Sequence, residues 1–361
     1  MIEKLLYVIL AAVGLYELVD LAVLRRMKKR LVHRARLLNL LMLLVILTGF
    51  AFAIEAMTLY LFLQIVLLNI VEMCVLVLAT TGIVLIFKTS VTTNFAQGTI
   101  ATVGAFTAAK LIIYLTANSA MPMSTKLILA LVSSAVVCFL IGLFIDTVIF
   151  RHSRYSNPVG KQMITMGIVL VLFGLMPVLF GLLPLTVEAF SYEGQIINLP
   201  NMFPLFLPNH NLYALCITVA MLVTLFAALR FTKWGLGVRA TASNETVASM
   251  MGVNTKLITA LSWGIAGAFG GVAAFLFAPV GNAVTVSFMT PVQVNAFLAS
   301  ILGGFSSFGG PLVGAVLINL FSSIASAINS VWTNVIVYVL VLLLVLAKPL
   351  GLFGKKTAKK V

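Results

Sequence analysis

Apolar runs of about 18 residues or more recur along this chain, and a helix of that length can cross a lipid bilayer. Inside bilayer hydrocarbon, helices and closed barrels are the structures that satisfy their own backbone hydrogen bonds. The 361 residues are 62% hydrophobic and 9% charged, with a mean hydropathy of +1.17. A soluble domain of this size could not cover itself with so few polar residues. We therefore predict an all-α, polytopic integral membrane protein with about 9–11 spans, some of them broken or re-entrant.

The basic residues lie in short clusters between the apolar runs. A net charge of +14 could suggest a nucleic-acid partner, but clusters of this kind follow the positive-inside pattern of membrane proteins. We therefore expect the lipid bilayer as surroundings, several passes across it, and no nucleic-acid partner. The predicted cytoplasmic segments are 25–36, 151–161, 231–256 and 355–361. Residues 186–211 contain Glu188 and Glu193 but no Lys or Arg, so they are predicted to face outward.

Apolar spans alternate with polar segments along the whole chain. Two transmembrane helices are predicted at 5–24 and 37–56. Further spans are predicted at 61–87, 97–115, 127–150, 163–183, 212–230, 257–277, 292–303, 312–327 and 331–347. Residues 355–361, after the last span, are a basic tail that is predicted to be cytoplasmic.

Two segments, 92–104 and 301–311, place small, polar or helix-breaking residues at membrane depth. Broken backbone is tolerated there inside the protein or along a water-filled cavity, and a pair of breaks points to a translocation pathway. The candidate pathway residues are Asn94, Phe95, Gln97, Gly98, Gly104, Gly303 and Gly304. The alternative is close helix packing through small residues, which we favour for the pairs Gly267/Gly271 and Gly310/Gly314.

The polar stretch 231–256 lies between two apolar runs in the second half of the chain. Ser243 is a suitable N-cap, Glu245 would complement the dipole of a first helical turn, and Gly252 is a suitable stop. The expected apolar side of this short helix comprises Val247, Ala248 and Met251. A helix of about two turns is unstable alone in water, so it should dock on a partner, although an ordinary solvated loop is equally consistent with the spacing.

No catalytic or metal-binding constellation is visible. His33, His152 and His210 have no cysteine or carboxylate at ligand spacing, so solvated or interfacial histidines are expected. The segment GLFGKKT lacks the glycine spacing of a phosphate-binding loop. We therefore expect no catalytic residue, no metal and no cofactor bound by this chain.

Function stays open between three classes at this point. Glu72 lies near the middle of the predicted span 61–87, and an ion-coupled secondary transporter would use such a residue. A transporter powered by a separate ATPase would not need it. A receptor or scaffold without transport activity is the third possibility.

Three motifs resemble one family of transporters. GLGVRATASNETVASMMGVNTKLITALSWGIAGAFGGVAA, at 235–274, resembles the cytoplasmic loop and following helix of LivH-type permease subunits from branched-chain amino acid ABC importers. TNFAQGTIATVGAF, at 93–106, is similar to a segment of that family, with Gln97 where histidine is common. ILGGFSSFGGPLVGA and KPLGLFG, at 301–315 and 348–354, resemble its C-terminal glycine-rich segment and closing phrase. The three motifs and the closing phrase occur in the family's order, and the resemblance runs from about residue 61 to residue 354. It therefore implies an N-terminal extension at residues 1–60 with the two extra predicted helices, a permease transmembrane domain at 61–354 and a basic cytoplasmic tail at 355–361. It also implies a bacterial plasma (inner) membrane as the location.

This resemblance implies an ABC importer permease fold for residues 61–354 and a coupling role for the loop 231–256. A short cytoplasmic helix of such a permease docks on an ATPase subunit, and the residues expected to do so here are Arg239, Glu245, Ala248, Gly252 and Asn254. The implied partners are ATPase subunits that bind ATP–Mg, a second permease that is a related sister chain, and an extracellular or periplasmic substrate-binding protein. The implied substrate is a branched-chain amino acid or a similar small polar solute, such as urea or an amide.

Overall fold

The computed structural model describes residues 59–153, 157–198, 204–281, 283–305, 308–348 and 351–353. The helices predicted at 5–24 and 37–56, the basic cluster 25–36 and the tail 355–361 lie outside the described residues. The elements are α3 (Leu59–Leu68), α4 (Ile70–Ser90), α5 (Gln97–Asn118), α6 (Met123–Phe144), the π-helix η2 (Ile145–Phe150), α7 (Pro158–Phe180), β1 (Gly194–Ile197), β2 (Leu205–Pro208), α8 (Asn209–Phe231), α9 (Lys233–Ser243), α10 (Glu245–Met250), α11 (Thr255–Phe277), α12 (Thr290–Gly303), α13 (Gly309–Ile328) and α14 (Thr333–Ala347).

Seven helices in the described part of the chain are long and apolar enough to cross a membrane. They are α4, α5, α6 continued by η2, α7, α8, α11 and the greater part of α13, and α14 is a shorter apolar helix. This confirms the predicted polytopic helical class, and most predicted span ends agree with the helix ends within a few residues.

The chain divides into two compact units. The larger comprises Leu67–Ile197, Phe206–Asn319 and Leu350–Val361, and the smaller comprises Met1–Val66, Asn198–Leu205 and Leu320–Pro349. In the smaller unit α13 ends close to Asn329, whose side-chain oxygen accepts from the backbone N–H of Val331 at 3.0 Å. That turn leads into α14.

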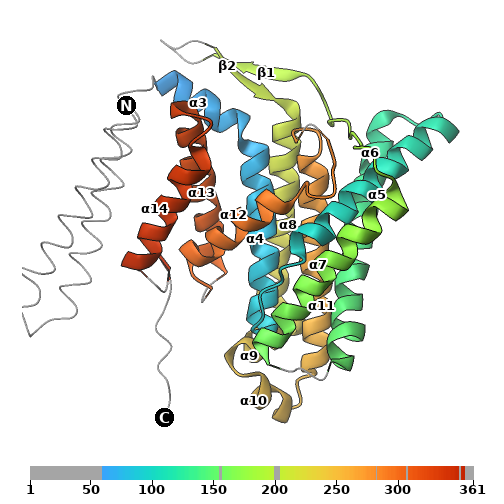
Figure 1. The fold of residues 1–361 in the computed structure, drawn as a ribbon, viewed down its shortest axis with the longest axis vertical. Helices are drawn as coiled ribbons and strands as arrows, with labels where there is room; N and C mark the ends of the chain where they lie inside the picture. Colours follow the sequence, from blue (N-terminus) through green and yellow to red (C-terminus); the bar gives the residue numbers. More distant parts are fainter. Residues whose placement is uncertain are drawn as a thin grey trace, which may run out of the picture. The chain divides into compact units, whose positions relative to one another are not determined.

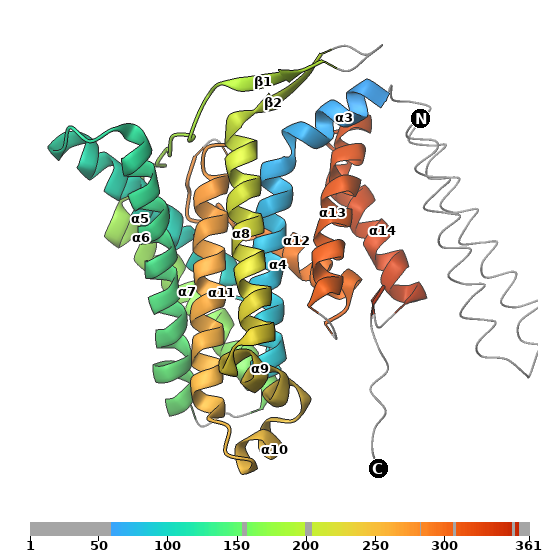
Figure 2. The ribbon, with the colours of Figure 1, turned by 180° about the vertical axis from the view of Figure 1, so that it is seen from behind.

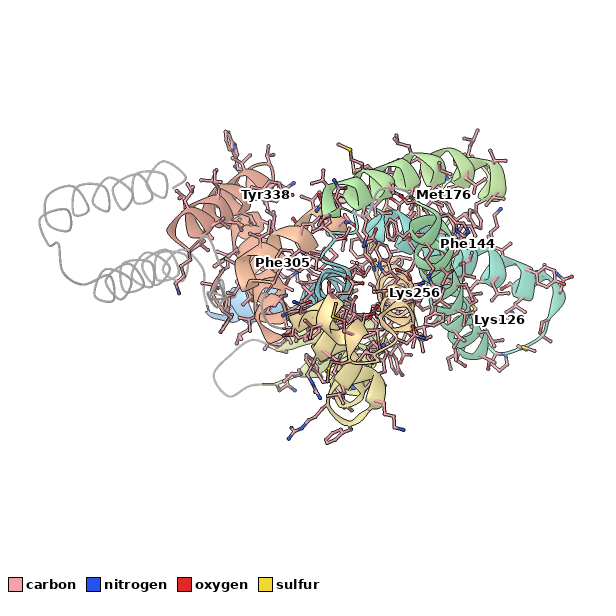
Figure 3. All side chains as sticks on the ribbon, turned by 90° about the horizontal axis from the view of Figure 1, so that it is seen from below. Lys126, Phe144, Met176, Lys256, Phe305 and Tyr338 are labelled. Carbon is pink, nitrogen blue, oxygen red and sulfur yellow. The ribbon has the colours of Figure 1, made fainter. Side chains whose placement is uncertain are left out.

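Helices α4 and α11 form the centre of the larger unit. In the most apolar stretch of each helix, 78% of the residues are buried. The corresponding share in α7 is 11%, because α7 lies on the outside of the bundle. Helix α11 packs against α4, α5 and α6, and α8 runs beside α4 (Figure 1). Phe144 and Met176 show the two environments: Phe144 is exposed on the outer surface, where lipid would lie, whereas Met176 points into the core (Figure 3).

Small residues allow α6 and α11 to pack closely. A Cβ atom on Gly271 would lie 2.6 Å from the carbonyl oxygen of Ser134, and one on Gly267 would overlap the carbonyl of Cys138. The Ser134 hydroxyl donates to the carbonyl oxygen of Gly271 at 2.9 Å across the same contact. The predicted packing role of Gly267 and Gly271 is therefore confirmed.

The polar segments of the larger unit gather at its two ends. Helices α9 and α10 lie at one end of the bundle, and the hairpin β1–β2 lies at the opposite end (Figures 1 and 2). Arg151 is at the same end as α10, because its guanidinium donates to the carbonyl oxygen of Lys256. In the described residues, the segments predicted to face inward, 151–153, 157–161 and 231–256, thus lie at the end opposite to the described parts of the outward segment 186–211.

Two predictions on the first half of the chain are corrected. The predicted span 61–87 is two helices, α3 and α4, separated at Asn69, because a single polar residue in a long apolar run gives no periodic signal. Glu72 is consequently an exposed residue in the first turn of α4, not a mid-span residue. The predicted span 127–150 is confirmed as one continuous span, Met123–Phe150, whose last six residues form the π-helix η2.

Candidate functional site

The first predicted break is present in the structure. The chain leaves α4 at Val91, a non-glycine residue with φ +49°, and has no regular structure until α5 begins. Helix α7 satisfies polar groups of this segment: the amide of Gln162 donates to the Thr93 hydroxyl at 2.8 Å, and the hydroxyl of Thr165 accepts from the backbone N–H of Phe95 at 3.2 Å. The open backbone is therefore held inside the protein, as membrane depth requires.

The start of α5 lies at the middle of the bundle. The Gln97 amide donates to the carbonyl oxygen of Ala266, near the centre of α11, at 2.6 Å. A Cβ atom on Gly82, near the centre of α4, would lie 3.0 Å from the Gln97 Nε2, and one on Gly270 of α11 would lie 2.9 Å from it. Gln97 therefore occupies a position half-way along two spanning helices.

Three amide side chains form one network at this position. Asn94, Gln97 and Gln293 are 0%, 2% and 9% exposed. The Asn94 amide donates to Gln97 Oε1 at 3.0 Å, and the Gln293 amide donates to the carbonyl oxygen of Asn94 at 3.1 Å. In return, Gln293 Oε1 accepts from the backbone N–H of Gly98, and Asn94 Oδ1 accepts from that of Ala96 at 2.9 Å. The sequence singled out Asn94 and Gln97 but missed Gln293, which is one of two amide residues, with Asn295, in the otherwise largely apolar segment 292–303.

The other candidate pathway residues near α5 lie in different surroundings. A Cβ atom on Gly98 would lie 2.9 Å from the side chain of Gln293, so only glycine lets α12 approach here. Gly104 lies further along α5, against Cys138 of α6 and Gly271 of α11. Phe95 is partly exposed, with its ring 5.2 Å from that of Phe297. Their roles in translocation stay predictions.

The second break follows α12. Gly304 has φ +87°, which favours glycine, and α13 begins five residues later. The C-terminal segment pairs with the end of α12: the N–H of Leu352 donates to the carbonyl of Leu302 at 2.7 Å, and that of Phe353 donates to the carbonyl of Gly303 at 3.2 Å. Carbonyl groups left open at a helix end are thereby satisfied inside the protein. The sequence did not predict this pairing.

Helix α4 connects the two breaks. It ends at the first break, and its last turn contacts the second, where the rings of Phe87 and Phe305 are 4.4 Å apart. The ammonium group of Lys88 lies 5.7 Å from the centre of the Phe308 ring. The two segments that the sequence marked as interrupted are therefore close in space.

The polar stretch 231–256 contains two helices rather than the predicted one. Helix α9 begins after Thr232, whose hydroxyl accepts from the N–H of Gly235 at 3.1 Å. The guanidinium of Arg239 donates to the carbonyl of Leu229 at 2.7 Å and so fastens α9 to the last turn of α8. Sequence reasoning missed α9 because its glycines and polar residues give little helical signal.

Helix α10 has the predicted position but a different cap. Asn244, not Ser243, is the N-cap, and its side-chain oxygen accepts from the N–H of Val247 at 3.1 Å. The chain turns out of α10 at Gly252, with φ +85°, as predicted. Asn254 then caps α11, with its side-chain oxygen accepting a backbone hydrogen bond at 3.1 Å.

The exposed face of α10 differs from the predicted one. Val247, Met250 and Met251 are 52%, 80% and 80% exposed, whereas Ala248 is 5% exposed. The sequence predicts one apolar side formed by Val247, Ala248 and Met251, and the structure corrects this, because Ala248 is buried against its own chain while the other two are exposed. Spacing does not show which side of a short helix the rest of the chain covers. Glu245 is exposed in the first turn, where an acid suits the helix dipole.

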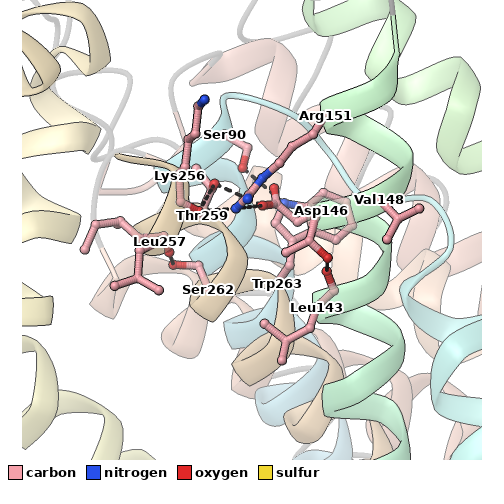
Figure 4. Close-up of polar contacts among 12 residues, drawn as sticks. Ser90, Leu143, Asp146, Val148, Arg151, Lys256, Leu257, Thr259, Ser262 and Trp263 are labelled. Carbon is pink, nitrogen blue, oxygen red and sulfur yellow. Dashed lines mark hydrogen bonds and ion pairs between the residues drawn. The ribbon is translucent and has the colours of Figure 1, made fainter. Parts of the chain in front are cut away.

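A polar cluster connects α11 and η2 at the end of the bundle that carries α9 and α10 (Figure 4). The carboxylate of Asp146, in η2, accepts from the Thr259 hydroxyl at 3.2 Å and lies 3.8 Å from the guanidinium of Arg151. Arg151 also donates to the carbonyl of Lys256, in the first turn of α11, at 3.0 Å. The end of α6 and the start of α11 are thus tied together directly beside α10.

Helix α11, which begins beside this cluster, also contacts the end of α4, where the first break begins. The indole N–H of Trp263, on α11, donates to the hydroxyl of Ser90 at 3.1 Å, and Ser90 is the last residue of α4. The ring of Phe150, at the end of η2, packs edge-on against Trp263 at 5.0 Å. A continuous set of contacts therefore leads from the start of α11 to the segment that precedes α5.

The opposite end contains the acidic hairpin region. Glu188 and Glu193 are exposed, and an isolated bridge between Leu185 and Val284 holds the loop. His210 corrects a prediction: it is buried, with Nε2 3.0 Å from the carbonyl of Leu276. In the residues that the structure describes, no group of three or more His, Cys, Asp or Glu side chains could hold a metal ion.

Comparisons with known proteins agree on one family. A family model described as "Branched-chain amino acid transport system / permease component" matches residues 65–346. The chain is 28% identical over 288 residues to "Probable branched-chain amino acid transport permease protein LivH" of Methanocaldococcus jannaschii, covering 77% of this chain and 88% of that protein. It is 23% identical over 273 residues to "High-affinity branched-chain amino acid transport system permease protein LivH" of Escherichia coli, covering 74% and 87%. No solved structure matches the chain.

Proposed function

Because this chain belongs to the family of branched-chain amino acid transport system permeases, we propose that it forms part of the translocation pathway of an importer powered by separate ATPase subunits. The chain is a transport component and a multi-pass protein of the bacterial inner membrane. The proposed substrates are branched-chain amino acids, with similar small polar solutes as the alternative. On this proposal the chain itself catalyses no reaction, and ATP–Mg is bound by the ATPase partners.

The exposed apolar stripe on α10 carries this proposal. Val247 and Met250 project from a helix of six residues and Met251 from its C-cap, and a helix this short is not stable without support. The support comes from this chain, through Ala248 packed inward and Asn244 as the cap. A rigidly held apolar stripe suits a hydrophobic cleft on a partner, and methionines adapt well to such a surface.

The other proposed partners correspond to other surfaces. A second permease, expected to be a related sister chain, would complete the pathway across the membrane. A substrate-binding protein would dock at the outer end, where the exposed acids Glu188 and Glu193 give a surface suited to basic groups. Support for the second permease comes from the family. Support for the binding protein comes from the family and from the exposed acids Glu188 and Glu193.

Reconstitution tests the function. The complete complex in proteoliposomes, with binding protein outside and ATP inside, should accumulate radiolabelled leucine only when ATP is hydrolysable. Accumulation driven by a proton or sodium gradient without the ATPase subunits would show an ion-coupled carrier instead. Competition by isoleucine, valine, urea and amides would then define the substrate class.

Met250→Glu tests whether the exposed apolar stripe on α10 binds the ATPase subunit. Loss of one buried apolar side chain costs about 1.5–3 kcal/mol, so binding of the ATPase should weaken by about 10- to 100-fold. Met121→Glu is the matched control, because Met121 is exposed in the loop between α5 and α6, away from α10. If Met250→Glu co-purifies with as much ATPase as Met121→Glu and wild type do, docking through α10 is refuted.

A further inference from the structure

Gln293 connects both interrupted segments of the chain. It lies near the start of α12, the helix that runs into the second break at Gly304. Its side chain reaches the first break, where its amide donates to the carbonyl of Asn94 and its oxygen accepts from the N–H of Gly98. The sequence separation between Gln293 and these partners is 199 and 195 residues.

The hydrogen bond to Gly98 has a specific physical role. Gly98 is the second residue of α5, and the first N–H groups of any helix have no partner within that helix. At the surface, water or a local side chain satisfies them, but α5 begins at the middle of the bundle, where Gln97 contacts the centre of α11. Gln293 supplies the missing acceptor from another helix, and an unpaired N–H there would be costly.

The amide group is chemically suited to this position. It provides one acceptor and one donor from a neutral group, so both contacts form without burying a charge. The partners of Asn94, Gln97 and Gln293 within the network are other amides and backbone groups. Glycine at position 98 leaves the space that the Gln293 side chain occupies.

We infer that Gln293 is a positioning residue for translocation: it caps α5 from α12 and makes the two broken segments move together. This inference rests on the proposed function, because it concerns the passage of substrate. It adds a residue that holds the pathway in shape, distinct from any residue that touches the substrate.

Uptake by the complete complex in proteoliposomes tests the inference. Gln293→Leu keeps the approximate size but removes both hydrogen bonds, and the initial uptake rate should fall about tenfold or more with the ATPase subunits still bound. Val294→Leu is the control on the same helix, because Val294 is exposed, and it should transport nearly as wild type does. Equal uptake by Gln293→Leu and wild type would overturn the inference while leaving the proposed function intact.

Gln293→Glu separates positioning from mere packing and serves if Gln293→Leu does not fold. A protonated glutamic acid retains a donor and an acceptor, whereas the ionised form loses the donor to Asn94. A carboxyl group enclosed by protein favours its neutral form, so uptake by Gln293→Glu, divided by wild-type uptake, should approach one as the pH is lowered from about 8 to 5.5. A ratio that stays far below one down to pH 5.5 would overturn the inference. A wild-type complex without ATP-driven leucine uptake would overturn the proposed function, and this inference with it.

Discussion

Gly104→Ala should destabilise the protein, although alanine normally favours a helix over glycine. Gly104 lies within α5, where the change would ordinarily stabilise by about 0.5–1 kcal/mol. The new Cβ atom, however, would lie 2.5 Å from both the Cys138 Sγ and the Ser134 Oγ, and 3.1 Å from the Cα of Gly271. Three helices meet at this point, so the crowding cannot be relieved by moving one surface side chain.

The size of the effect follows from the packing. Forcing an extra methyl group into a close-packed core costs about 1–3 kcal/mol. The neighbours cannot rotate away freely, because the Ser134 hydroxyl donates to the carbonyl of Gly271 and the Cys138 thiol donates to the carbonyl of Ile100. After subtraction of the gain in helix propensity, a net loss of up to about 2.5 kcal/mol is expected.

Gly174→Ala is the matched control, since Gly174 is also inside a helix, α7, but a Cβ atom there would meet nothing within 4 Å. In detergent, Gly104→Ala should lower the melting temperature and Gly174→Ala should leave it equal or raise it. The same shift in both variants would refute the crowding argument. Uptake per folded molecule then addresses the pathway role of Gly104: a rate close to wild type would indicate packing, and a lost rate with intact stability would indicate the pathway.

Two further predictions concern the ends of the bundle. In a background with the exposed Cys216 replaced by serine, Ser191→Cys should react with a membrane-impermeant thiol reagent from outside and Ser249→Cys from inside, and the reverse pattern would contradict the orientation. Arg151→Ala should change stability by about 1 kcal/mol or less, because the ion pair with Asp146 is partly exposed. It should nevertheless lower the amount of substrate taken up per ATP hydrolysed, because it removes the hydrogen bond from Arg151 to the carbonyl oxygen of Lys256. An unchanged ratio of uptake to ATP hydrolysis would argue against the idea that this cluster links ATP hydrolysis to transport.

The long apolar helices were predictable because their length and composition are local properties of the sequence. Predicted spans such as 97–115 and 257–277 correspond closely to α5 (Gln97–Asn118) and α11 (Thr255–Phe277). Asn69 shows the limit, because one polar residue within an apolar run does not reveal that the helix ends there. Both backbone breaks were also predictable, since clustered glycine and polar residues within an apolar stretch disfavour a continuous helix at membrane depth.

The partners of the site residues were not predictable, because they come from distant parts of the chain. Gln97 stood out as an amide near a break, but its bond to Ala266 spans 169 residues. Ala248 was assigned to the wrong face because the sequence does not say which side of a short helix its own chain covers. His210 appeared to be in a polar loop, yet folding buries it against Leu276 and Phe190.

The chemistry of the buried groups bears on the energy source. The groups gathered at the start of α5 are neutral amides, and an amide cannot gain or lose a proton under physiological conditions. Asp146 is a buried carboxylate in the described residues, but it lies at the end of the bundle that carries α10, engaged by Thr259 and Arg151. Glu72 lies in the first turn of α4 rather than at mid-span. An ion-coupled carrier would place an ionisable group at the site of substrate passage, so these positions favour energy delivered from the end that carries α10.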